Sequence, residues 1–284
     1  MPEGDTILWA AVRMRPVLEG HVPDEIRMPA PRPWALRGSP AFARWPERLA
    51  GRRITAVQTR GKNLLICFAG ELILYSHLRM TGAWGVYARG RRWRRSPERA
   101  WLVIRRGERE VVQFDGPVLE LMTAARARSD PRLARLGPDV LAERFDHADF
   151  LARLRAGEPT RTIGEALLEQ RTVAGIGNIW KSEGLWEAGI DPWRAVADLS
   201  DAEASAIIDG IRPRMLRSGV LGPRHAALRV YRRAGLPCPR CATPIRSRLE
   251  GEGARVTYWC PRCQRPPLLR SDRPRSQIGR APLP

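Results

Sequence analysis

The chain has 284 residues, 43% of them hydrophobic, which is enough for about two domains with their own cores. Its 49 basic and 30 acidic residues give a net charge of +19, which indicates a polyanionic partner, most commonly nucleic acid. The opposing interpretation, a charge that serves only solubility, explains so large an imbalance poorly. No apolar run reaches the roughly 20 residues of a membrane span, and the opening MPEGDTILWA lacks the pattern of a secretory signal. We therefore expect a cytoplasmic protein without a membrane partner.

The first 120 residues favour a sheet structure that follows one helix. An amphipathic helix is predicted over residues 5–14, and Gly, Pro or charged turns separate six short β-rich runs, at 53–57, 64–68, 71–75, 84–87, 101–105 and 110–114. One helix and six strands predict a two-layer β-sandwich or a barrel. The segment Arg89–Arg99 is interpreted as an exposed basic loop that connects two strands.

From Asp130 onward the pattern becomes helical. Helices are predicted at 131–136, 146–155, 162–170, 178–188 and 200–216. The last twenty residues are rich in Pro and Arg and are typical of a disordered tail. The expected fold class is α+β, with a β-sandwich domain (1–125), a helical domain (126–232), a cysteine-bearing ribbon (233–266) and a basic tail (267–284).

Four cysteines form the most specific motif. Two CxxC pairs, Cys238/Cys241 and Cys260/Cys263, are separated by eighteen residues, a spacing typical of a β-hairpin that offers four thiolates to one tetrahedral Zn²⁺. Two disulfides are the competing interpretation, which a reducing cytosol disfavours. Four protein ligands leave no open coordination position, so we expect the zinc to be structural. Cys67, within an apolar run, is predicted to be a small buried hydrophobe.

A second motif combines glycines with a helix start. In Gly175-Ile-Gly177-Asn178 the glycines let backbone N–H groups approach an anion at the start of a helix, and Asn178 adds a side-chain donor. Alone, this pattern is also typical of an ordinary turn between helices. Arg255 is the first residue of an alternating strand predicted between the two cysteine pairs. Its side chain could contact a phosphate, or it could be an exposed strand arginine without such a role.

The N-terminus offers unusual chemistry. If Met1 is removed, Pro2 carries a free secondary amine, and an α-amino group titrates near pH 7.7–8.0, far below lysine. Such an amine can attack an electrophilic sugar carbon and form an iminium, and the adjacent Glu3 can act as a general acid. The alternative is a start of chain without a chemical role.

Six short motifs in one order resemble the formamidopyrimidine-DNA glycosylase/endonuclease VIII family of base-excision repair enzymes over nearly the whole chain. They are Pro2-Glu3-Gly4, Arg60-Gly-Lys62-Asn-Leu-Leu65, Ser76-His-Leu-Arg-Met-Thr-Gly82, Leu136-Gly-Pro-Asp139, Gly175-Ile-Gly-Asn-Ile179, and the CxxC ribbon with Arg255. The start Pro-Glu-Gly resembles the endonuclease VIII branch, whose members mainly excise oxidised pyrimidines.

The resemblance implies a role for each matching residue. Pro2 would be the nucleophile on C1′ of the damaged nucleotide and Glu3 the general acid. Glu183 falls on the family's acidic position in the second helix of a helix–two-turn–helix motif at 162–188 and would orient the site. The phosphates around an everted nucleotide would be held by Lys62, Asn178 and Arg255, and the void left in the stack would be filled by Leu78, Arg79 and Met80.

Three departures from the family pattern bear on the substrate. Asp115–Glu120 replaces the segment that carries Arg–Phe void fillers in relatives that excise oxidised purines, and the interval from Met215 to Cys238 is short. Both agree with a preference for pyrimidines. Thr6 stands where many relatives have a glutamate, which points to altered proton handling or to a subgroup with weak activity.

Three hypotheses follow. The first is a DNA glycosylase and abasic-site lyase that acts through a Pro2 Schiff base and β,δ-elimination, works as a monomer on damaged DNA and is associated with the bacterial nucleoid. The second retains the lyase on abasic or single-stranded DNA with weak glycosylase activity. The third is a non-catalytic protein that binds damaged DNA. The sequence leaves the lesion, the opposite base and the strandedness of the substrate open.

Overall fold

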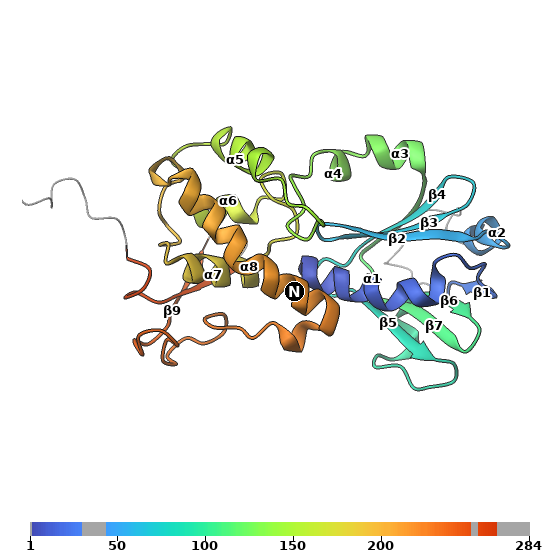
Figure 1. Ribbon diagram of the computed structural model, residues 1–284. Helices are drawn as coiled ribbons and strands as arrows, with labels where there is room; N and C mark the ends of the chain where they lie inside the picture. Colours follow the sequence, from blue (N-terminus) through green and yellow to red (C-terminus); the bar gives the residue numbers. More distant parts are fainter. Residues whose placement is uncertain (1, 30–43, 251–254, 266–284) are drawn as a thin grey trace, which may run out of the picture.

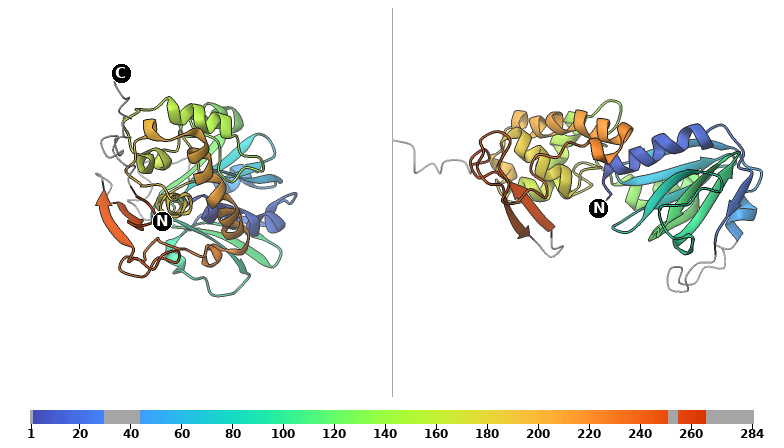
Figure 2. Two further views of the ribbon diagram at one scale, coloured as in Figure 1. Left: turned by 60° about the vertical axis from the view of Figure 1, so that its left-hand side comes forward. Right: turned by 90° about the horizontal axis from the view of Figure 1, so that it is seen from below.

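The computed structural model of the chain describes residues 2–29, 44–250 and 255–265 (Figure 1). The predicted tail at 267–284 and the state of Met1 lie outside these residues. Two lobes stand side by side, one built mainly of strands and one mainly of helices with a β-hairpin at its outer end (Figures 1 and 2).

The N-terminal lobe is a sandwich of two four-stranded antiparallel sheets, as the sequence predicted. One sheet has the order β1-β6-β7-β5 and consists of Glu25–Arg27, Ala100–Arg106, Arg109–Phe114 and Ala83–Ala88. The other has the order β2-β3-β4-β8 and consists of Ile54–Arg60, Asn63–Phe68, Leu72–His77 and Val118–Thr123. Fully buried aliphatic side chains between the sheets, among them Leu64, Ile66, Leu74 and Ile104, hold the two layers together.

Two strands of this lobe were not predicted. β8 pairs with β4 along its whole length, although its sequence Val-Leu-Glu-Leu-Met-Thr has only a weak alternation and follows Pro117. β1 is three residues long and is defined by its pairing with β6. Cys67, expected to be buried, is half-buried in β3. Short helices that the sequence did not predict are α2 (Trp45–Leu49) and α3 (Ala124–Ser129).

The second lobe is helical and contains four of the five helices predicted from Asp130 onward, with shifts of up to five residues at their ends. They are α5 (His147–Arg155), α6 (Ile163–Leu168), α7 (Asn178–Ala188) and α8 (Asp201–Leu221), with short 3₁₀ turns at Val196–Asp198 and Pro223–His225 and, in the other lobe, at Pro97–Arg99. The fifth is α4 (Pro131–Ala134), which packs on the sandwich, where Leu133 is buried in one cluster with Leu65 and Tyr75. Capping boxes, in which a hydroxyl and a glutamate satisfy each other's backbone N–H groups, start α6 at Thr162 and α8 at Ser200. The core of this lobe includes the fully buried Phe150, Trp180 and Ile207.

The lobes meet where α1 (Gly4–Leu18) packs against α8. Ser218 donates a hydrogen bond of 2.5 Å to the buried Asp5 carboxylate, which explains why α8 extends to Leu221, beyond the predicted residue 216 and beyond Pro213. The Gly4 N–H also donates to the Gly175 carbonyl over 2.9 Å. These contacts set Pro2 and Glu3 at the junction of the lobes.

The ribbon consists of β9 (Arg246–Glu250) and β10 (Arg255–Trp259), an antiparallel pair that packs on α7. The predicted strand that begins at Arg255 is confirmed. Among the described residues, no helix has both the length and the apolar character needed to cross a bilayer.

Candidate active site

The carboxylate of Glu3 occupies the N-terminus of α7. It accepts hydrogen bonds from the backbone N–H groups of Gly177 (2.9 Å), Ile179 (2.7 Å) and Trp180 (3.2 Å). The glycine motif thus receives an anion at a helix start, as the sequence indicated, and this anion belongs to the chain itself. A Cβ at Gly177 would lie 2.4 Å from the Glu3 carboxyl carbon, so only glycine fits there.

Burial sets the charge state of Glu3. Its side chain has no exposed surface, and desolvation raises the pKa of the carboxyl to about 7, against the opposing effects of the Lys62 ammonium and of the backbone donors. Near neutral pH a large fraction of Glu3 therefore carries a proton. A carboxyl with such a pKa is suited to general acid catalysis.

Lys62 lies close enough to Glu3 for the two charges to interact. Burial lowers the pKa of the Lys62 ammonium, while Glu3 opposes this shift and Arg255 adds to it. Lys62 follows Gly61, whose N–H donates to Asp139 Oδ2 over 2.7 Å and whose φ of +57° suits a glycine. Asp139, from the helical lobe, thereby fixes the turn that presents Lys62.

Pro2 is half-buried and lines a pocket of about 330 Å³ that is formed by the start of the chain and by the sandwich lobe. Thr6 and Trp9 of α1 line the same pocket, as do Met80 and Arg95 from two loops of the sandwich. Met80 is 68% exposed and stands in the β4–β5 turn. Arg79, beside it, is exposed and lies close enough to His77 to affect the pKa of the imidazole. The structure thus brings Pro2 and the predicted wedge together.

Asn178 and Arg255 lie at the contact between α7 and the ribbon. Asn178 Nδ2 donates to the Val256 carbonyl over 2.8 Å, and its buried Oδ1 has no hydrogen-bond partner among the described residues. Arg255 is exposed at the start of β10, and its charge acts on both Lys62 and Lys181. Four positions far apart in sequence, at 3, 62, 178 and 255, thus surround one site.

Glu183 lies apart from this site. Its carboxylate is fully buried and accepts hydrogen bonds from the N–H groups of Arg229 (2.9 Å), Val230 (2.9 Å) and Tyr231 (3.0 Å), and from Arg214 (2.7 Å). It organises the segment that leads from α8 into the ribbon, so any influence on catalysis passes through that segment.

Sequence reasoning gave no role to two residues near the site. Lys181 is 1% exposed on α7, hydrogen-bonds Thr257 Oγ1 and lies 3.8 Å from Glu250 Oε2, which ties the ribbon to the helix. Burial and the charges of Arg79 and Lys62 lower the pKa of His77 to about 4, so its imidazole is neutral at pH 7. The sequence did contain evidence for a role of Lys181 near the site, because the chain has only two lysines and Lys181 lies on the same face of the predicted helix as Asn178.

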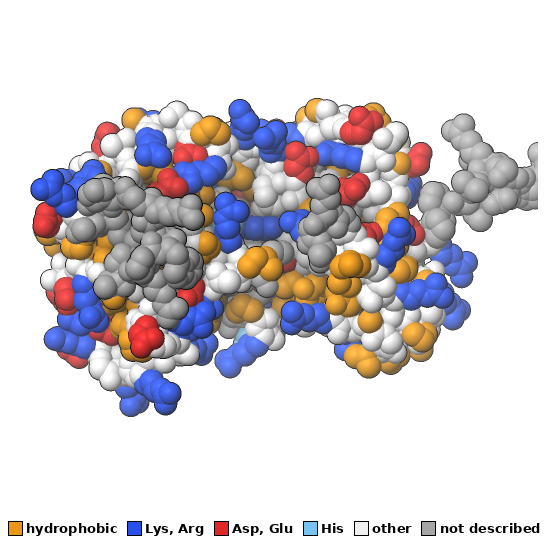
Figure 3. Space-filling view, turned by 180° about the vertical axis from the view of Figure 1, so that it is seen from behind, with side chains coloured by type: hydrophobic (Ala, Val, Ile, Leu, Met, Phe, Trp, Pro, Cys, Tyr) orange, Lys and Arg blue, Asp and Glu red, His pale blue; other side chains and the backbone are white. Residues whose placement is uncertain are grey.

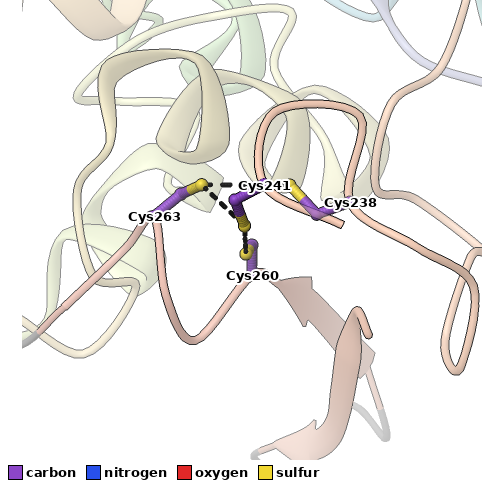
Figure 4. Close-up of side chains that lie close together, drawn as sticks. All are labelled: Cys238, Cys241, Cys260 and Cys263. Atoms are coloured by element: carbon purple, nitrogen blue, oxygen red, sulfur yellow. Dashed lines mark hydrogen bonds between the residues drawn. The ribbon is translucent and has the colours of Figure 1, made fainter. Parts of the chain in front are cut away.

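The four predicted cysteines come together at the end of the ribbon (Figure 4), with all four Sγ atoms within 4.8 Å of one another. The Sγ–Sγ distances are 3.9 Å for Cys238–Cys263, 3.5 Å for Cys241–Cys260 and 3.4 Å for Cys241–Cys263. A tetrahedron with Zn–S bonds of about 2.3 Å requires about 3.8 Å, so the four thiolates fit one zinc ion. The Trp186 indole N–H donates to Cys238 Sγ over 3.4 Å and supports the cluster.

Lysine and arginine side chains are visible across the waist between the lobes in the space-filling view (Figure 3). A basic surface between the lobes, a pocket lined by Pro2, and the buried Glu3 carboxyl with Lys62 nearby are typical of one class of protein, the enzymes that act on bases and sugars in DNA.

Comparisons with known proteins specify the class. The family models "Formamidopyrimidine-DNA glycosylase N-terminal domain" (residues 1–119), "Formamidopyrimidine-DNA glycosylase H2TH domain" (136–224) and "Zinc finger found in FPG and IleRS" (235–266) match the chain in this order. The chain therefore belongs to the formamidopyrimidine-DNA glycosylase/endonuclease VIII family, and it is a DNA glycosylase and abasic-site lyase with one structural zinc.

Relatives with curated names agree. The probable endonuclease 8 2 of Streptomyces coelicolor is 38% identical and covers 95% of this chain and 96% of its own length. The DNA-(apurinic or apyrimidinic site) lyase Nei2 of Mycolicibacterium smegmatis is 33% identical, with 93% of this chain and 99% of its own length covered. Both names lie on the endonuclease VIII side of the family.

Solved structures share the fold. The Lactococcus lactis Fpg in complex with DNA containing an abasic site superimposes with a TM-score of 0.78 at 24% identity, over 93% of this chain and 100% of the other. The same enzyme in complex with DNA containing an oxidised pyrimidine gives the same TM-score and coverage at 25% identity.

Proposed function

We propose that this chain excises oxidised bases, mainly pyrimidines, from DNA and cuts the strand at the resulting abasic site, with Pro2 as nucleophile and Glu3 as general acid. The observation that carries the proposal is that Glu3 is buried at the start of α7 with a pKa of about 7, directly after Pro2, which lines a pocket of about 330 Å³. The amine and the acid thus stand side by side where the two lobes meet.

The covalent step starts once Met1 has been removed. The nitrogen of Pro2 attacks C1′ of the everted nucleotide, the N-glycosidic bond breaks, and the bonding electron pair leaves with the base. The base takes up the proton that Pro2 loses. Glu3 then donates its proton to O4′ as the C1′–O4′ bond breaks, which leaves an iminium between Pro2 and C1′.

Strand cleavage follows from the iminium. The Glu3 carboxylate, which has just given up its own proton, takes a C2′ proton as the 3′ phosphate leaves, and water takes a C4′ proton as the 5′ phosphate leaves. Water hydrolyses the iminium and releases Pro2. Atoms and charges balance with water as the only co-reactant.

The basic residues around the pocket hold the DNA. Lys62 and Arg255 bind phosphates, and Asn178 contributes the amide hydrogen that Val256 does not use. Arg79 and Met80 enter the base stack of the DNA at the position that the damaged nucleotide leaves. The side chain of Met80 is 68% exposed and is therefore accessible to DNA. Glu183 positions the segment at 229–231. In this proposal the protein acts as a monomer at the bacterial nucleoid.

Borohydride trapping tests the nucleophile. We would prepare the chain with a cleavable N-terminal extension and compare it before and after release of Pro2, with duplex DNA that carries an oxidised pyrimidine. A covalent adduct is expected only after release, while DNA affinity stays similar in both forms. An adduct with the blocked N-terminus, or none with the free one, would refute the proposal.

A second function is a lyase that acts mainly on existing abasic sites. Thr6 lines the pocket beside Pro2, and none of the described residues that line the pocket carries a carboxylate to bind the edge of a base. Nei2 of M. smegmatis, named as a lyase, points the same way. Single-turnover cleavage of matched duplexes with an oxidised pyrimidine or an abasic site separates the two, because this function predicts cleavage of the abasic duplex alone.

A further inference from the structure

Arg95 joins three separate turns of the sandwich lobe beside the Pro2 pocket. Its Nη1 donates to the Thr81 carbonyl over 2.6 Å, in the β4–β5 turn, and to Asp115 Oδ2 over 2.5 Å, in the β7–β8 turn. Arg95 itself stands in the β5–β6 loop. The sequence favoured a solvated connection for this loop, whereas the Arg95 side chain is only 30% exposed.

The β4–β5 turn depends on outside support. Arg79 has a φ of +43°, a conformation that disfavours a residue with a Cβ. Gly82 closes the turn by donating to the Leu78 carbonyl over 2.9 Å, and its Cα lies so close to Leu78 that a Cβ would be 2.8 Å from the same oxygen. Buried Leu78 anchors one side of the turn, and Arg95 holds the other side through Thr81.

The turn and Arg95 share the pocket with Pro2. Leu78, Met80 and Arg95 line this pocket together with Pro2 and Thr6.

Arg99 provides an internal comparison. It also pairs with Asp115, with Nε 2.9 Å from Oδ1 and Nη2 2.6 Å from Oδ2. Its side chain is 47% exposed, and it is not among the residues that line the pocket of Pro2. The two arginines thus share a carboxylate and differ in the contact with the Thr81 carbonyl.

We infer that Arg95 is a positioning residue that fixes the Leu78–Met80 turn against the Pro2 pocket, so that the turn enters duplex DNA as a rigid wedge. The inference rests on the proposed function. It concerns only eversion from a stacked duplex, so an abasic site in a single strand, which has no stack to open, does not need Arg95.

The experiment compares Arg95→Met, Arg95→Lys and Arg99→Met with the unchanged chain. The rate of borohydride trapping is measured under single-turnover conditions with an abasic site in a duplex and in a single strand of the same sequence. Arg95→Met is expected to slow the duplex reaction by about tenfold, which corresponds to the loss of about one charge-assisted hydrogen bond, and to leave the single-strand rate within about twofold. Arg95→Lys should recover part of the duplex rate, and Arg99→Met should retain it.

A fluorescent 2-aminopurine next to the lesion provides a second measurement, since its emission rises when the neighbouring base unstacks. A lower amplitude is expected for Arg95→Met alone. Equal slowing of both substrates, no slowing of the duplex, or an equal effect of Arg99→Met would overturn the inference. If Arg95→Met fails to fold, the ratio of duplex to single-strand rates for Arg95→Lys, expected to lie below that of the unchanged chain, decides it. If the unchanged chain forms no adduct with either substrate, the proposed function fails and the inference fails with it.

Discussion

The β-sandwich and the ribbon carry opposite ends of the site, and different forces hold them together. The sandwich buries a continuous set of aliphatic side chains between its two sheets. The ribbon has a small apolar cluster around Trp186, Val230 and Ile245, two of its cysteines included, and its shape depends on four thiolates that converge on one zinc. The amine and the acid therefore stand beside a lobe that folds by burial of apolar surface, whereas Arg255 stands on an element that needs a metal.

Loss of the metal should have the largest effect. Cys260→Ser removes a zinc ligand, and structural zinc sites contribute about 10 kcal/mol or more to the folding of small metal-dependent domains. We expect the ribbon to unfold and the affinity for damaged DNA to fall about a hundredfold. The backbone amides in the strands of the sandwich should stay protected from hydrogen exchange. Amide hydrogen exchange by mass spectrometry, with zinc quantified in parallel, measures each part. Faster exchange in β2–β4 as well would contradict the independence of the sandwich from the ribbon.

A core substitution in the sandwich should destabilise the sandwich and leave the zinc site of the ribbon intact. Leu74→Ala removes a fully buried side chain between the sheets, and such changes cost about 2–5 kcal/mol of the free energy of unfolding. The unfolding midpoint in urea should fall while the zinc content stays at one ion per chain. Loss of zinc in parallel with stability would show that the two regions unfold as one.

The carboxyl of Glu3 comes from the first lobe and is buried against α7 of the second. Its titration should change the stability of the chain with pH, by less than the loss of zinc does. Because the pKa is about 7 in the folded chain and about 4.5 in the unfolded chain, the native state binds more protons between these values. The stabilising contribution of Glu3 is thus complete below about pH 4.5 and is lost as the pH rises through about 7, with an upper limit of about 3 kcal/mol. Glu3→Gln should therefore raise the melting temperature relative to the unchanged chain at pH 8, and should not do so at pH 4.

The same group should control activity. Base excision by the unchanged chain should pass through a maximum between about pH 7 and about pH 8, because it needs Glu3 protonated and the Pro2 amine unprotonated. Glu3→Gln should be slow, and its rate should only rise with pH in this range. Single-turnover rates from pH 5.5 to 8.5 provide the measurement. A decline that persists in Glu3→Gln would assign the titration to another group.

Much of the fold was predictable because its signals are local. Short β-rich runs between turns predicted β2 to β7, helical patterns broken by Gly and Pro predicted α6 and α8, and the cysteine spacing predicted the zinc site. β8 escaped prediction because its pairing with β4, and not its own pattern, makes it a strand. The length of α8 escaped prediction because contacts with α1, such as Ser218–Asp5, continue the helix past Pro213.

The sequence by itself determined the composition of the site: an N-terminal Pro-Glu pair, a rare lysine after a glycine, a glycine-rich helix start and two cysteine pairs. These features are readable because each needs only a few neighbouring residues. Only the tertiary structure decided the contacts of Glu183 and Arg95 and the burial that raises the pKa of Glu3. Burial and hydrogen-bond partners arise from segments far apart in the chain, and such long-range contacts leave no local pattern.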